Sequence, residues 1–105
     1  MDRCSSKIRI NMNNKFYVSL EAEELLKEKG CPIDGRITKA EAIDWLESNT
    51  GFIISEDRRC DGFWYYVIFQ GNDIWYDSDC HDNGVFLTRW EAQEAGIIRV
   101  LTEFL

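Results

Sequence analysis

The chain has 105 residues, of which 45% are hydrophobic, 30% charged and 13% aromatic, and it contains seven Gly and one Pro. This length and composition suit one globular domain and exclude a long low-complexity tail. The formal net charge of −7 opposes binding to nucleic-acid phosphates or anionic lipids, both of which require clustered cations. We therefore expect no direct binding of nucleic acid or membrane.

The N-terminal segment is polar, and we expect residues 1–15 to form a loosely ordered leader before a single α+β domain over residues 16–105. Ile8 and Ile10 alternate with charged residues, so a short edge strand is the alternative there. No segment has the apolar length of a signal peptide or of a membrane span, which takes about 20 residues. The sequence therefore predicts a cytoplasmic protein.

The cysteines are widely spaced along the chain, at Cys4, Cys31, Cys60 and Cys80. A small secreted domain held by disulfides has a denser cysteine framework. We therefore expect four free thiols in a reducing compartment.

Two helices are predicted in the first half of the domain, over residues 19–29 and 38–48. Ser19 is a favourable N-cap for the first helix. Thr38, followed three residues later by Glu41, forms the reciprocal capping box of the second. Apolar residues at helical spacing assign four side chains of these helices to the core: Leu25, Leu26, Ile43 and Leu46.

After Gly51 the apolar pattern has a period of two, which predicts strands over residues 52–56, 63–69 and 74–77 in an antiparallel meander. Residues 85–87 are a candidate fourth strand. The middle strand is apolar on both faces, with Trp64, Tyr66 and Ile68 on one and Phe63, Tyr65, Val67 and Phe69 on the other. One face must meet the helices, and the other is either covered or forms an aromatic surface. We assign Val67 to the core.

A last helix is predicted over residues 88–104, because Thr88 and Glu91 form a second capping box. Ile97 and Leu101 lie on its inner face. The order of elements predicts an α+β fold in which three helices pack on a three- or four-stranded antiparallel β-meander, mainly on one face.

The polar segment after residue 76 offers three candidate metal ligands, Asp79, Cys80 and His81. A calcium loop that began at Asp79 would have His81 at its third position and Trp90 at its twelfth, where carboxylates are needed. Structural zinc sites take ligands in spaced pairs, whereas Cys80 and His81 are adjacent. A solvated acidic loop is the favoured interpretation, so we predict no metal, no cofactor and no catalytic residue. A metal- or thiol-dependent enzyme, with His81 as the base, is the least favoured alternative.

Aromatic and acidic side chains together suggest an interaction surface. Trp64, Tyr66 and Trp75 on adjacent strands could form a stacking platform, with cross-strand packing as the alternative. The acidic loop would add the charged rim of an interface. The predicted surface consists of Trp64, Tyr66, Trp75, Asp77, Asp79 and Asp82. Spaced carboxylates can also imitate DNA phosphates, so an acidic DNA-mimic inhibitor of a nucleic-acid-binding protein is the main alternative function.

Four stretches of the chain are similar to one group of proteins, and they span residues 13–30, 41–46, 63–68 and 88–97. They resemble small uncharacterised proteins encoded by prophages and mobile elements of gut anaerobic bacteria. The resemblance implies membership of that group and no particular activity. With it, we predict a non-enzymatic cytoplasmic accessory protein of a mobile element that acts by contact with an unidentified protein partner.

Overall fold

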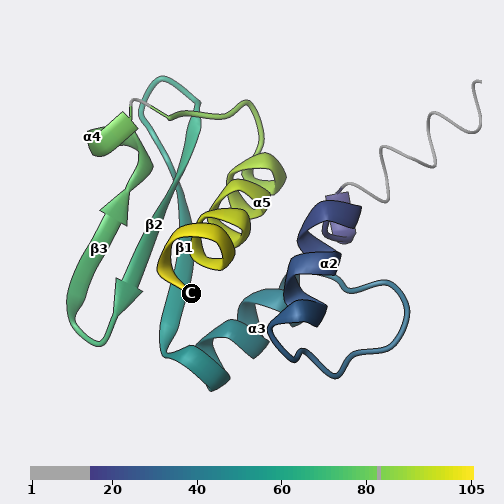
Figure 1. Ribbon diagram of the computed structural model, residues 1–105. Helices are drawn as coiled ribbons and strands as arrows, with labels where there is room; N and C mark the ends of the chain where they lie inside the picture. Colours follow the sequence, from purple (N-terminus) through teal and green to yellow (C-terminus); the bar gives the residue numbers. More distant parts are fainter. Residues whose placement is uncertain (1–14, 83) are drawn as a thin grey trace, which may run out of the picture.

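The computed structural model describes residues 15–82 and 84–105, so the leader predicted over residues 1–15 lies almost wholly outside the described residues (Figure 1). The described elements form an α+β fold. In chain order they are α2 (Leu20–Glu28), α3 (Lys39–Thr50), β1 (Phe52–Arg58), β2 (Trp64–Gln70), β3 (Asp73–Asp77), α4 (Ser78–Asp82), α5 (Arg89–Arg99) and the π-helical turn η1 (Val100–Phe104). No helix in this part of the chain is both long and apolar enough to cross a membrane.

The sheet is an antiparallel meander in the order β1-β2-β3, as the alternating pattern predicts. An irregularity between Ile68 and Phe69 shifts the register of β2 against β3 at Trp75, which has no directly paired residue. The candidate strand over residues 85–87 reduces to a single bridge between Trp64 and Phe86.

The predicted helix starts are confirmed in atomic detail. Ser19 Oγ accepts a hydrogen bond from the Ala22 amide at 3.1 Å. Thr38 with Glu41 and Thr88 with Glu91 form complete capping boxes at the start of α3 and α5. Such caps satisfy amide groups that the helix itself leaves without partners, and they depend on residues only three positions apart.

Helix α5 packs across β1 and β2 and lies between the sheet and α2 in Figure 1. Its close approach to the sheet requires Gly96. A Cβ atom at this position would lie 2.8 Å from Ile54 Cγ2 and 3.2 Å from Tyr66 Cδ1. The missing side chain therefore sets the distance between helix and sheet.

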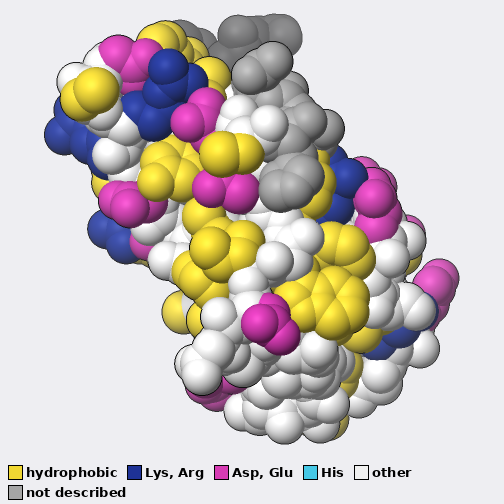
Figure 2. All heavy atoms as spheres, turned by 90° about the vertical axis from the view of Figure 1, so that its left-hand side faces the viewer, with side chains coloured by type: hydrophobic (Ala, Val, Ile, Leu, Met, Phe, Trp, Pro, Cys, Tyr) yellow, Lys and Arg dark blue, Asp and Glu magenta, His cyan; other side chains and the backbone are white. Residues whose placement is uncertain are grey.

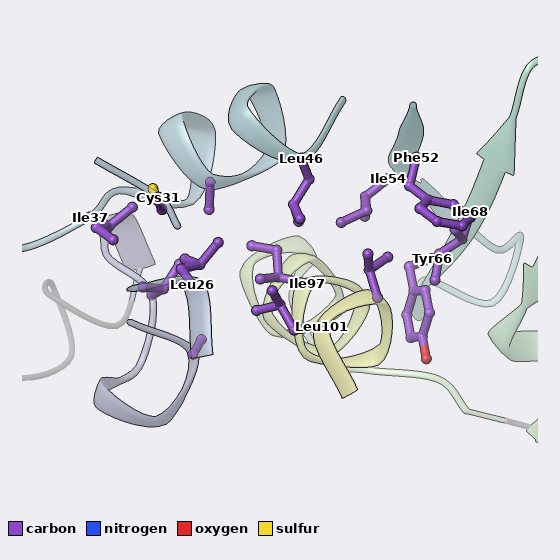
Figure 3. Close-up of a cluster of buried hydrophobic side chains, with 14 of the residues drawn as sticks. Leu26, Cys31, Ile37, Leu46, Phe52, Ile54, Tyr66, Ile68, Ile97 and Leu101 are labelled. Carbon is purple, nitrogen blue, oxygen red and sulfur yellow. The ribbon is translucent and has the colours of Figure 1, made fainter. Parts of the chain in front are cut away.

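The core is continuous from the loop before α3 to the sheet (Figure 3). Four predicted core residues are buried: Leu26, Leu46, Ile97 and Leu101. Leu25 and Ile43 are partly buried and pack against this cluster.

The assignment of Val67 to the core is wrong. Tyr66 and Ile68 are the core residues of β2, and Val67 faces away from α5. Because β2 is apolar at successive positions, its pattern does not determine which face meets the helices. The close packing of Gly96 against Tyr66 fixes that choice in three dimensions.

Candidate functional site

The three aromatic residues of the predicted interaction surface do not form one platform. Tyr66 is only 3% exposed, and its hydroxyl accepts a hydrogen bond from Arg99 Nε at 3.2 Å. Its inclusion in an exposed surface is therefore wrong, because it belongs to the face of the sheet that α5 covers. Trp75 is 48% exposed, although its ring packs edge-on against Phe52 at 5.1 Å. Trp64 is half-buried.

The acidic residues of that surface take part in local structure. Asp77 Oδ1 accepts hydrogen bonds from the backbone amides of Asp79 and Cys80 at 3.0 and 3.2 Å. It thereby caps the start of the short helix α4, where the sequence predicted a loop. Asp79 forms an ion pair with Arg59 at 2.9 Å. The side chain of Asp82 lies outside the described part of the structure.

Of the candidate metal ligands, the structure describes the side chains of Asp79 and Cys80. Among the described residues, no group of three or more His, Cys, Asp or Glu side chains could hold a metal ion. The carboxylates of Asp77 and Asp79, together with partial desolvation, raise the pKa of the Cys80 thiol above its usual value. The thiolate that metal binding or nucleophilic attack requires is therefore disfavoured at Cys80. The side chain of His81 is outside the described part.

The face of the sheet opposite α5 carries an apolar surface that sequence reasoning placed on the wrong side. We call it the open face; it consists of Ile53, Ser55, Asp57, Tyr65, Val67, Phe69, Ile74 and Asp77. The register pairs Ile53 with Phe69 and Phe69 with Ile74, so one apolar row crosses all three strands. Ile74 is 61% exposed at the end of this row. None of the described helices covers it.

The other end of the open face is acidic. The register places Asp77 opposite Val67 and Asp57 opposite Tyr65. The Tyr65 hydroxyl donates a long hydrogen bond of 3.5 Å to Asp57 Oδ2. Desolvation and then the charges of Asp57 and Asp77 raise the pKa of Tyr65 above its ordinary value of 10.0. The open face therefore combines an apolar end with a negatively charged end and carries no Lys or Arg.

A groove of about 750 Å³ lies beside α5, and its lining shares no residue with the open face. We call it the α5 groove; its lining includes Tyr17, Ser19, Lys39, Phe86, Trp90, Glu94 and Ile98. Its polar part is built by tertiary hydrogen bonds. Lys39 Nζ donates to the Tyr17 carbonyl oxygen at 2.8 Å, and the Ser19 amide donates to both oxygens of Glu94 at 3.2 and 3.3 Å.

Lys39 is the feature of the groove that sequence reasoning missed. It is only 3% exposed, and burial lowers the pKa of its ammonium group while the charge of Glu94 opposes this shift. The signal in the sequence that could have identified Lys39 is its position directly after the Thr38 cap. The first turn of a helix favours acidic residues, so a lysine there breaks a local rule.

Comparisons with protein-family models, with curated proteins and with solved structures found no match. The resemblance to small proteins of prophages and mobile elements therefore remains a prediction from the residues of this chain.

Proposed function

We propose that the protein acts by direct contact with another protein, as a non-enzymatic accessory protein of the cytoplasm, and that the open face is its contact surface. The observation that supports this most strongly is the apolar row of Ile53, Phe69 and Ile74 across the three strands. An antiparallel sheet that is covered on one side usually presents polar side chains on the other. Here the three outward positions of β2 are Tyr65, Val67 and Phe69.

Exposed apolar surface also occurs on the other side of the edge strand. Trp75, at the register shift of β3, is partly exposed, and its ring packs against Phe52 and Phe104 on the side of the sheet that α5 and η1 cover. Figure 2 shows hydrophobic side chains gathered over the middle of the side of the molecule that carries β3. Contiguous exposed apolar surface on a small soluble domain is typical of an interaction site, and aromatic residues are enriched in the centres of interfaces.

We infer the chemistry of the partner from the charges of the open face. Asp57 and Asp77 lie at one end of the face. A complementary surface would bring apolar side chains to the row through Phe69 and Lys or Arg side chains to the acidic end. Charge complementarity of this kind accelerates association and excludes partners of like charge.

The alternative of a DNA mimic uses the same acidic segment but receives less support. A mimic presents its carboxylates to a basic protein as a substitute for phosphates. The Asp79 carboxylate already has a cation beside it, since Arg59 Nη1 lies 2.9 Å away. Catalysis by the Cys80 thiol is disfavoured by the neighbouring carboxylates, which raise the pKa of that thiol. We therefore place protein contact first.

The proposal is tested by a pair of matched substitutions. Ile74 on the open face and Leu20 on α2 are 61% and 66% exposed, so lysine can replace either without entering the core. The tagged protein and both variants are used to capture proteins from cells of the source organism, and captured candidates are purified for binding measurements. We expect a partner whose binding is lost with Ile74→Lys and retained with Leu20→Lys. Equal binding by both variants, or no specific partner of the unmodified protein, would contradict the proposal.

The same two variants also test whether the occupant of the open face is a second copy of the chain. Sedimentation analysis of the purified protein measures its oligomeric state. A dimer that Ile74→Lys dissociates and Leu20→Lys does not would identify a second copy as the occupant of the open face.

A further inference from the structure

The α5 groove takes no part in the proposed protein contact, and the formal charges of its lining are balanced. Lys15 and Lys39 are matched there by Glu91 and Glu94. The lining therefore does not select an ion of either sign. The apolar part of the groove determines what fits it.

This apolar part follows one side of α5. Trp90, Ala95 and Ile98 lie along the helix, and Phe86 continues the wall before the helix begins. Because Trp90 and Ile98 are separated by two helical turns, this side of the groove is about 12 Å long. The exposed ring of Phe16 lies 6.3 Å from the ring of Trp90 and extends the wall.

The chain enters the described structure at the rim of this groove. Lys15 is the first described residue, and it belongs to the lining. Its Nζ lies 5.3 Å from the ring centroid of Trp90. Residues 1–14 are therefore joined to the protein beside the apolar wall. A short tether of this kind gives a segment an effective concentration on the order of millimolar, so weak apolar contacts suffice for binding.

The sequence of this segment has a pattern that suits the wall. Apolar residues occupy alternate positions, and charged or amide residues lie between them. In an extended chain Ile8, Ile10 and Met12 would share one face, and the distance from the first to the last would be about 13 Å. This span matches the length of the wall. Met12 is close to Lys15 in the chain and so lies within about 10 Å of it.

Electrostatics favours the same occupant. Residues 1–14 contain the cations of Arg3, Lys7 and Arg9 and the single carboxylate of Asp2, whereas the whole chain has a net charge of −7. The remainder of the chain therefore attracts the segment. In an extended chain the charged residues of the alternating stretch lie on the face opposite its apolar residues, so their charges can remain in water while the apolar face is buried.

We propose that the α5 groove binds the N-terminal segment of the same chain, with Ile8, Ile10 and Met12 against α5. The segment would then cover the ring of Trp90 and close the groove to other ligands. This inference is independent of the proposed protein contact, because the groove and the open face share no residue. Either proposal can therefore fail without the other.

The first test compares two substitutions in the full-length chain. Ile10→Ser removes an apolar side chain from the inner face of the segment, and Arg9→Ser changes the adjacent position on its outer face. NMR follows the indole N–H signals of the four Trp residues. We expect Ile10→Ser to shift the Trp90 signal several times more than Arg9→Ser does, and neither to shift that of Trp75. Equal shifts of the Trp90 signal, or no shift, would overturn the proposal. Thermal unfolding checks that both variants fold.

Photo-crosslinking within the chain provides a second, direct measurement. A photoreactive amino acid replaces Ile10 or, as the control, Arg9, and proteolysis with mass spectrometry locates the products. Position 10 should crosslink to residues 90–98 of the same chain, and position 9 should give a much lower yield there. No such product from position 10, equal yields from the two positions, or products only between two chains would overturn the proposal.

Discussion

Gly96 of α5 and Ile54 of β1 lie so close together that a Cβ atom on Gly96 would be 2.8 Å from Ile54 Cγ2. Because Ile54 and Tyr66 are both buried core residues, neither can move away without disturbing the sheet. This contact links the helix layer to the sheet and determines which face of β2 is left open.

Gly96→Ala should therefore destabilise the protein, even though alanine is the better helix former. Overpacking of a core typically costs about 1–3 kcal/mol, which exceeds the gain of about 1 kcal/mol from replacing glycine within a helix. Denaturant unfolding measures the difference. Ser48→Ala, on the exposed side of α3, is the control and should change the free energy of unfolding by less than about 0.5 kcal/mol. A stabilised Gly96→Ala variant would show that the helix does not approach the sheet this closely.

Leu101→Ala tests the place of η1 in the core. Leu101 is buried within the cluster that joins α2 to the sheet, so its truncation should cost about 2–5 kcal/mol. Leu87→Ala removes the same atoms from an exposed leucine and should change stability by less than about 0.5 kcal/mol. A similar small loss for both variants, measured by thermal or denaturant unfolding, would place Leu101 outside the core.

The helix starts could be predicted because their determinants are local. Thr38 and Glu41, or Thr88 and Glu91, satisfy each other within one helical turn, whatever surrounds them. The three strands could be predicted for the same reason, because alternation of apolar residues with a period of two is also a local pattern.

The open face could not be predicted because its determinant is tertiary. Successive apolar residues in β2 allow either face to be buried, and only the contact between Gly96 and Tyr66 distinguishes the two. The α5 groove depends in the same way on Lys39 meeting Tyr17, which is 22 positions away in the sequence. The unusual lysine after a helix cap was a signal of the site, but nothing local indicated its partner.

Titration of Tyr65 tests the acidic end of the open face. Its pKa is raised by desolvation and by the charges of Asp57 and Asp77, so the phenol should stay protonated above its ordinary value of 10.0. The folded state therefore holds the phenol proton more tightly than the unfolded state does. This contribution to the free energy of unfolding is fully present below the pKa of the unfolded state and is lost as the pH rises through the pKa of the folded state. Asp57→Asn should lower the Tyr65 pKa, as followed by NMR of labelled tyrosine. An unchanged Tyr65 pKa in Asp57→Asn would show that the charge of Asp57 does not act on Tyr65.

The central claim is that another protein contacts the open face, and site-directed photo-crosslinking tests it most directly. A photoreactive amino acid replaces Ile74 on the open face or Leu20 on α2, both of which are largely exposed. After irradiation in cells of the source organism, we predict a discrete crosslinked protein from position 74 and none from position 20. The same products from both positions, or no product from position 74, would contradict the account.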